Sequence, residues 1–235
     1  MLVIFGLPLC VYSTILDTMM KDCFLNRKFK YTYANATVYL VLINVFVYFA
    51  TYYSGITIRG LRLVYWLSLI PGCINMGWVW QFVTYMFVHG SPTHLFFNMF
   101  ALIMFGRILE RTLGTREFLL FYFLCGILGG VVNYLFYLVQ GVMGVAVMGA
   151  SGAIYALLFL CAVMFPSSQI LLFFFIPMKM PYAVMMYIAI EVFSQVYGIA
   201  NGVAHLIHLA CILIAWLYVV LRFRVNPIKV WKENL

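Results

Sequence analysis

The stretch GVAHLIHLACILIAWLYVVL, residues 202–221, is apolar along its whole length, yet it carries two histidines near its start. A helix needs about 20 mostly apolar residues to cross a bilayer, and this run has that length without an Asp, Glu, Lys or Arg. Ionisable side chains are costly at such depth, and by default they mark functional sites. His205 and His208 therefore require partners from elsewhere in the chain.

The composition of the whole chain is that of an integral membrane protein. Its 235 residues are 66% hydrophobic and 9% charged, whereas a soluble domain is roughly half apolar and a quarter charged. We attribute the net charge of +8 to basic cytoplasmic loops, and we expect no nucleic-acid partner. The six cysteines lie mostly in apolar runs, so we expect small buried hydrophobes rather than disulfides.

Apolar runs predict an all-α membrane protein with six transmembrane helices. The runs lie at Asn35–Tyr53, Thr93–Glu110, Thr115–Val139, Ala150–Phe165, Pro181–Val196 and Gly202–Leu221. If the chain before the first run is inside, the external loops keep only Arg59 and Arg62 of the 14 Lys and Arg residues. Such an asymmetry predicts that both termini are cytoplasmic.

We expect residues 35–222 to form one six-helix domain. Residues 1–34 precede it as a cytoplasmic or interfacial segment, and residues 223–235 follow it as a basic cytoplasmic tail. The first 16 residues are short for a span and contain Pro8, which favours an interfacial or buried segment over a seventh helix. The long first external loop contains RGLRLVYWLSLIPG, residues 59–72. This stretch fits either a helix in the membrane interface or an ordinary loop with aromatic belt residues.

Ser151 opens the fourth run in the sequence MGASGAIYALL, residues 148–158. Gly149 and Gly152 flank it closely, so backbone can approach the hydroxyl. Tyr155 follows four residues later on the same helix face. The glycine-rich, uncharged loop at 140–149 is expected to dip into the protein and to carry Ser151 below the membrane surface.

A second polar cluster opens the second run, in HGSPTHLFFNMFAL, residues 89–102. His94 and Asn98 are four residues apart and share one helix face. Both side chains can donate hydrogen bonds, as an oxyanion site requires. His89 lies at the outer end of this helix. The alternative is interhelical hydrogen bonding, at roughly 1 kcal/mol per bond or less.

Helix depth and helix face together favour His208 over His205 as the partner of Ser151. Ser151 and His208 lie about 21 and 20 Å from the inner ends of their runs, and His205 lies about 24 Å out. Cys211 and Ala215 follow His208 on one stripe, where small side chains let the sixth run pack against the fourth. We therefore predict that His208 is the base for a Ser151 nucleophile, and that His205 is an outer, supporting residue.

No aspartate is available at this depth to orient the imidazole of His208. Packing against Tyr155 could orient the ring instead. Glu191 lies inside the fifth run, where an acid needs a partner, and we interpret it as a structural hydrogen-bonding residue.

Taken together, these residues resemble the rhomboid intramembrane serine proteases. The resemblance runs from about Thr37 to Leu221. Its motifs are His89, His94 and Asn98; Gly106, Glu110 and Gly114; Gly149, Ser151, Gly152 and Tyr155; and the histidine of the sixth run. The chain departs from the family pattern at Ala210 and Cys211, which replace two glycines, and at Gln81, which follows Trp80 in place of an arginine.

The resemblance implies that Ser151 attacks a peptide bond in or beside the transmembrane segment of a single-span membrane protein, with His208 as base. It implies an oxyanion and substrate-binding site at His94, Asn98, Gly149, Ala150 and Tyr155, with His89 and His205 in support. The fifth span would be the lateral gate for substrate. We expect no cofactor and no metal. We expect a multi-pass protein of the bacterial cytoplasmic membrane, with an active site open to the extracytoplasmic side.

Two other functions stay open at this point, as does the oligomeric state. A rhomboid-like protein could bind transmembrane segments without cutting them. A metal or proton transporter could use the four histidines. Metal sites of that kind usually recruit carboxylates or thiolates as well, and none stands beside these histidines in the sequence.

Overall fold

The computed structural model describes residues 29–172, 176–197 and 203–234. Each predicted apolar run forms a helix. These helices are α2 (Ala36–Tyr52), the rod formed by α6 (Pro92–Ala101), η3 (Leu102–Gly106) and α7 (Arg107–Leu113), α8 (Thr115–Gln140), α9 (Ser151–Met164), α10 (Met180–Tyr197), and α11 (Val203–Tyr218) with η5 (Val219–Phe223). The predictions for residues 1–16, and for most of segment 1–34, lie outside the described residues.

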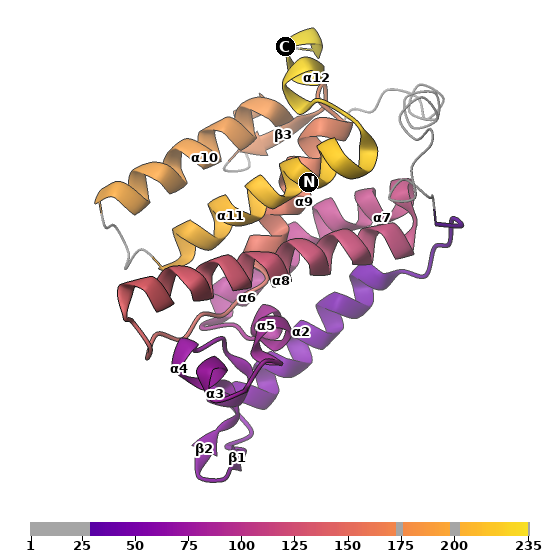
Figure 1. The fold of residues 1–235 in the computed structure, drawn as a ribbon. Coiled ribbons are helices and arrows are strands. Elements are labelled where there is room, and N and C mark those ends of the chain that lie inside the picture. The colour runs from indigo at the N-terminus through magenta and orange to yellow at the C-terminus, as the bar shows by residue number, and fades with distance from the viewer. Residues whose placement is uncertain (1–28, 173–175, 198–202, 235) are drawn as a thin grey trace.

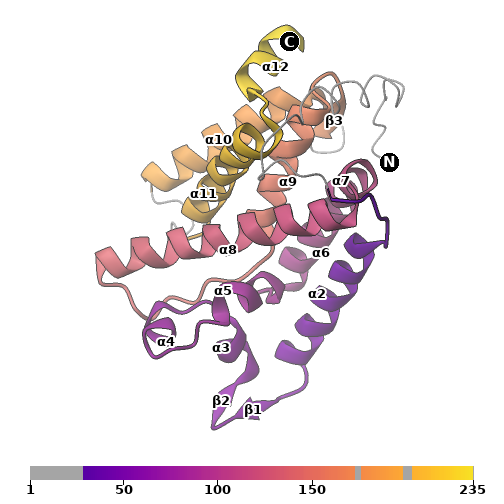
Figure 2. The same cartoon turned by 45° about the vertical axis from the view of Figure 1, so that its right-hand side comes forward.

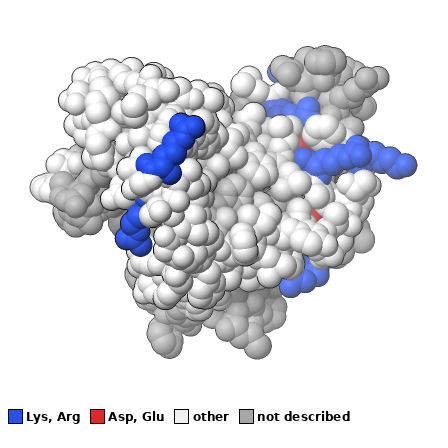
Figure 3. All heavy atoms as spheres, turned by 90° about the horizontal axis from the view of Figure 1, so that it is seen from below, with Lys and Arg blue, Asp and Glu red and all other residues white. Residues whose placement is uncertain are grey.

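Three of these helical rods are long and apolar enough to cross a membrane, namely Pro92–Leu113, Thr115–Gln140 and His205–Phe223. Helices α2 and α9 are shorter apolar helices. Large apolar side chains face outward on α2, including Leu42, Phe46 and Phe49. An extended apolar exterior marks a surface that meets a membrane. In Figure 3, Lys and Arg side chains lie toward two opposite sides of the face and leave a broad uncharged area between them.

Helix α9 lies at the centre of the bundle, between α2 on one side and α10 on the other (Figures 1 and 2). Nearly all of its residues are buried, because α11, α8 and α10 all pack against it. An all-apolar helix is stable where neighbours cover every face. Ser151, its first residue, is half-buried at the start of this helix.

Glycines on α8 and α9 allow α11 to pack closely despite the two replaced family glycines. A Cβ on Gly129 would lie 2.2 Å from the Cys211 sulfur, and one on Gly152 would lie 2.8 Å from it. The Cys211 thiol also donates a hydrogen bond to the Cys125 carbonyl at 3.3 Å. The cysteine therefore occupies space that two facing glycines provide, and the interface stays closed.

The long loop between α2 and α6 is built from short elements. These are the hairpin of β1 (Thr57–Ile58) and β2 (Leu61–Arg62), the helices α3 (Leu63–Leu67), α4 (Pro71–Asn75) and α5 (Gln81–Thr84), and the 3-10 turn η2 (Tyr85–Phe87). Residues 59–72 thus hold a hairpin strand and two short helical turns rather than one continuous interfacial helix. Gly60, at φ 79°, turns the hairpin, and Pro71 begins a separate helix because it suits the first helical position.

Gln81 holds this loop together from a fully buried position. Its amide oxygen accepts a hydrogen bond from the Ile70 N–H at 3.0 Å, and its amide nitrogen donates to the Tyr65 carbonyl at 2.9 Å. Beside it, the rings of Trp66 and Trp80 stack with that of Trp78. A neutral amide therefore ties the loop segments together at the position where the family pattern has an arginine.

The C-terminal residues form more than a basic tail. Helix α12 (Pro227–Asn234) packs against α9. The Trp231 indole donates a hydrogen bond to the Ala162 carbonyl at 3.0 Å, and its ring meets Phe159 edge to face. A boundary between residues 222 and 223 would also cut through η5. On the same side of the bundle, β3 (Gln169–Leu172) and β4 (Ile176–Lys179) form an antiparallel hairpin between α9 and α10.

Glu110 joins the α6–α7 rod to the start of α2. Its carboxylate accepts hydrogen bonds from the N–H groups of Ala36 and Thr37, at 2.7 and 2.9 Å. It also accepts from the hydroxyls of Thr37 and Thr115, at 2.8 and 2.6 Å. The first N–H groups of a helix have no acceptor within the helix, and an anion there also suits the helix dipole. Gly106 leaves room for the contact, since a Cβ there would lie 2.9 Å from Thr37.

We expect Glu110→Ala to lower the free energy of unfolding by about 3 kcal/mol, because it leaves several buried donors without an acceptor. Thermal unfolding in detergent measures this. Glu233→Gln is the matched control, since it removes the same charge from an exposed acid and should leave the midpoint within about 1 °C. A Glu110→Ala midpoint equal to that of the control would contradict this account of the motif.

Candidate active site

Ser151 and His208 meet inside the bundle. The Ser151 Oγ lies 2.7 Å from Nε2 of His208, which is within hydrogen-bond distance. The Tyr155 ring stacks on the imidazole, with centroids 4.2 Å apart and an interplanar angle of 12°. His208 is mostly buried, at 8% exposure. Helices α9 and α11 thus bring together a hydroxyl and an imidazole that are 57 residues apart in the chain.

The loop before α9 is fixed to the long loop between α2 and α6. Val147 pairs with Leu69 through two backbone hydrogen bonds, of 3.0 and 2.8 Å. The Gly149 N–H donates to the Tyr85 carbonyl at 2.9 Å, and Ala150 is almost fully buried. Gly149 itself has φ 123°, a conformation that L side chains rarely adopt. The position of Ser151 is therefore set by loop backbone on one side and by α9 on the other.

His94 borders the space beside Ser151. A Cβ on Gly149 would lie 2.9 Å from Nε2 of His94 and 3.8 Å from the Ser151 Oγ. Nδ1 of His94 accepts a hydrogen bond from the Gly90 N–H at 3.4 Å. A neutral imidazole that accepts at one nitrogen carries its proton on the other. The geometry therefore places the N–H donor of His94 on the side of Gly149 and Ser151.

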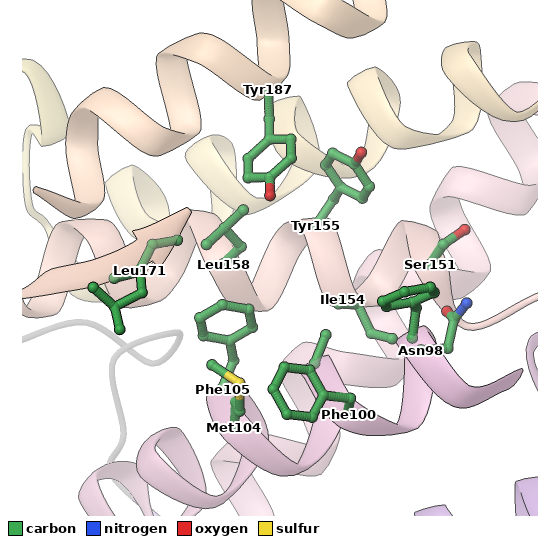
Figure 4. Close-up of a pocket in the computed structure, with 13 residues that line it drawn as sticks. Asn98, Phe100, Met104, Phe105, Ser151, Ile154, Tyr155, Leu158, Leu171 and Tyr187 are labelled. Carbon is green, nitrogen blue, oxygen red and sulfur yellow. The ribbon is translucent and has the colours of Figure 1, made fainter. Parts of the chain in front are cut away.

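Asn98 lies one helical turn after His94 and is adjacent to Ser151 in the pocket (Figure 4). Its amide nitrogen donates to the His94 carbonyl at 2.8 Å. A side-chain amide carries two N–H donors, so one remains for another group. The two residues predicted to form an oxyanion site thus sit on α6 beside the Ser151 hydroxyl.

His89 lies behind His94 rather than at the serine. It is fully buried, and its ring meets that of His94 edge to face at 5.0 Å. Burial, together with the neighbouring His94, lowers the pKa of His89 to about 4. The ring is therefore neutral near pH 7, and its Nδ1 lies 3.3 Å from the Phe87 carbonyl. The supporting role that the resemblance implies for His89 stays a prediction.

Glu191 contributes to the site from α10, which the sequence did not reveal. One carboxylate oxygen lies 2.9 Å from Nδ1 of His208 and also accepts a hydrogen bond from the Tyr155 hydroxyl. The other oxygen contacts Nδ1 of His205. Our interpretation of Glu191 as a purely structural residue omitted these partners. The available signal was the acid itself, because a carboxylate within an apolar helix needs a polar partner.

Glu191, His205 and His208 also form a group that could hold a metal ion. One possible ligand atom from each lies within 4.8 Å of the other two. The sequence argument against a metal site, that no carboxylate stands beside the histidines, therefore does not hold in space. In this geometry the ligand atoms are hydrogen-bonded to one another, and a cation would have to replace those bonds.

An apolar cavity of about 600 Å³ opens beside Ser151. Figure 4 shows Ser151 and Asn98 at one end and Leu171 at the other, with Tyr155 and Tyr187 along the wall. The remaining lining comes mostly from apolar side chains of α6, η3 and α9, among them Phe100. Its polar lining groups are those of Ser151 and Asn98 at one end and those of Tyr155 and Tyr187 along the wall.

Comparison with known proteins defines the class. The family model of the rhomboid domain matches residues 76–225, which is more than half of the chain. The chain therefore belongs to the rhomboid family, and with its apolar helices it is a multi-pass integral membrane protein. The resemblance stated from the motifs is confirmed.

Individual relatives are similar over shorter stretches. YdcA of Bacillus subtilis (strain 168) is 36% identical over 100 residues, covering 40% of this chain and 47% of that protein. The chloroplastic Rhomboid-like protein 11 of Arabidopsis thaliana is 32% identical over 124 residues, covering 53% and 40%. Rhomboid protease GlpG of Haemophilus influenzae is 36% identical over 81 residues, covering 34% and 38%. The chain thus spans less than half the length of each of these relatives.

Proposed function

We propose that the protein is an intramembrane serine endopeptidase that cleaves single-span membrane proteins in or beside their transmembrane segments. The observation that carries the proposal is the 2.7 Å contact between the Ser151 Oγ and Nε2 of His208. In this mechanism His208 accepts the hydroxyl proton as Oγ attacks the scissile carbonyl. It then gives the proton to the leaving amine, and water hydrolyses the acyl-enzyme by the same route.

Three donors are available for the oxyanion that this attack creates. His94 offers an Nε2–H, Asn98 offers the second N–H of its amide, and Ser151 offers its backbone N–H at the start of α9. That backbone group has no acceptor within the helix, and it lies at the positive end of the helix dipole. Gly149 and Ala150 form the backbone beside this position. Donors fixed before the reaction lower the barrier without reorganisation.

The apolar cavity supports a membrane-embedded segment as substrate. A peptide whose scissile bond lies at the Ser151 end would extend past Tyr155 and Tyr187 toward Leu171. The floor and walls would contact apolar side chains, as a transmembrane segment requires. In this proposal α10 borders the path by which the segment enters.

The proposal includes the membrane arrangement. Six spans would form the domain at 35–222, with both termini cytoplasmic and the first external loop at the membrane interface. The basic residues support this orientation, because the external loops would hold only Arg59 and Arg62. The site would then open to the extracytoplasmic side, and a bacterial cytoplasmic membrane is the proposed location.

The test combines active-site labelling with cleavage. Purified protein in detergent is expected to react with a fluorophosphonate at Ser151, as mapped by mass spectrometry. It is also expected to cut a single-span substrate whose transmembrane segment contains helix-destabilising residues. Ser151→Ala should abolish both signals, and EDTA should change neither. Binding of the substrate without cleavage or labelling would instead support a rhomboid-like binding protein, and loss of cleavage with EDTA would support a metal site.

A further inference from the structure

We infer that Glu191 is the positioning residue that converts the Ser151–His208 pair into a three-membered unit. This inference rests on the proposed function and assigns a role in it to an acid on a third helix. Ser151 comes from α9, His208 from α11 and Glu191 from α10. The chain of contacts runs from the Ser151 Oγ through the two imidazole nitrogens to one oxygen of Glu191.

Glu191 selects the tautomer of His208. A carboxylate only accepts hydrogen bonds, so the nitrogen that faces it must carry a proton. Nδ1 of His208 faces Glu191 at 2.9 Å, and Nε2 then has a lone pair directed at the Ser151 hydroxyl. That is the tautomer that a general base requires. When Nε2 takes the serine proton, the ring becomes a cation, and the carboxylate beside Nδ1 stabilises it.

The Glu191 carboxylate also holds the His208 ring indirectly, through Tyr155. It accepts a hydrogen bond from the Tyr155 hydroxyl, and the Tyr155 ring stacks on His208. Its second oxygen contacts His205. A charge buried to this extent is costly unless several hydrogen bonds satisfy it, and Glu191 is 4% exposed. This network satisfies the acid and at the same time fixes the position of the base.

The contacts also give His205 a role. Its Nδ1 lies against the oxygen of Glu191 that does not face His208. Through this contact His205 acts on the base by way of Glu191, as an outer group that helps to hold the carboxylate in place. A single acid explains why two histidines stand three residues apart on one helix.

The experiment compares Glu191→Gln, Glu191→Asp and a control, Ser194→Ala, on the same helix. Ser194 is also buried and lies about one turn further along. For Glu191→Gln we expect kcat to fall roughly 10²–10⁴-fold with KM within about threefold, because the amide can donate to Nδ1 and so select the wrong tautomer. Fluorophosphonate labelling of Ser151 should slow in parallel. Glu191→Asp should recover part of kcat, and Ser194→Ala should stay within about threefold of wild type.

Histidine ¹⁵N NMR reports which ring nitrogen of His208 carries the proton. A purely structural role of Glu191 would leave that preference unchanged. Signals of His208 are assigned by their loss in His208→Ala. We expect Nδ1 to be protonated and Nε2 unprotonated in the wild type, and this preference to be lost in Glu191→Gln. The wild-type spectrum decides the question even if the glutamine variant fails to fold.

Failure of the role of Glu191 and failure of the proposed function give different experimental results. Glu191→Gln with wild-type kcat and labelling, or wild-type His208 with Nδ1 unprotonated, would overturn the role of Glu191 and leave the serine protease intact. Wild-type protein that neither cleaves substrate nor reacts at Ser151 would overturn the proposed function, and this inference with it.

Discussion

His208→Ala is expected to reduce substrate cleavage by roughly 10³-fold or more, whereas His205→Ala should reduce it by less than about tenfold. The two variants differ in this way because the two histidines lie at different positions relative to Ser151. Nε2 of His208 lies 2.7 Å from the Ser151 Oγ, whereas the His205 ring contacts Glu191. Removing His208 leaves the serine without a base. Removing His205 leaves the base present and takes away one of the groups that hold its carboxylate.

Initial rates on one single-span substrate, measured side by side with fluorophosphonate labelling, provide the test. Both variants should retain the thermal unfolding midpoint of the wild type within a few degrees, so that a loss of rate reports chemistry rather than folding. An inactive His205→Ala beside an active His208→Ala would show that the assignment of the base is reversed.

Gly149→Ala is expected to reduce cleavage by about 10²-fold or more, although it adds only one methyl group. The new Cβ would lie 2.8 and 2.9 Å from Cε1 and Nε2 of His94, and the backbone at φ 123° is strained for any L residue. Either the His94 ring or the loop must shift, and both border Ser151. A displacement of about 1 Å at reacting groups is enough for a loss of this size.

Gly144→Ala is the matched control for this prediction. Gly144 lies in the same loop, a Cβ there meets nothing within 4 Å, and its φ is not positive. That variant should cleave at the wild-type rate within about twofold, because surface changes of this kind have small effects. Equal activities of Gly149→Ala and Gly144→Ala would show that His94 does not need its present position.

Local parts of the site could be predicted from the sequence because helix geometry places residues four apart on one face. His94 with Asn98, and Ser151 with Tyr155, are such pairs. The structure places Asn98, Ser151 and Tyr155 around one cavity and His94 beside Gly149. Their catalytic roles stay predictions. The resemblance to the rhomboid proteases implies that Tyr155 stacks on His208, and the two rings are stacked in the structure.

The sequence by itself determined the class of protein and the course of its helices. The free energy of transferring a helix into a bilayer is close to a sum of contributions from its own residues. An apolar run therefore identifies a transmembrane helix without knowledge of the helices that pack against it. The family motifs are equally local. The bounds of α2, α8 and α11 with η5 accordingly fall within a few residues of the predicted runs.

Only the tertiary structure decided which polar groups meet between helices. Glu191 reaches His208 from 17 residues away, and Cys211 fits against Gly129 on another helix. Such contacts depend on the rotation of each helix about its axis and on its depth relative to its neighbours. An apolar pattern that runs around the whole helix does not fix that rotation; the packing of the complete bundle does.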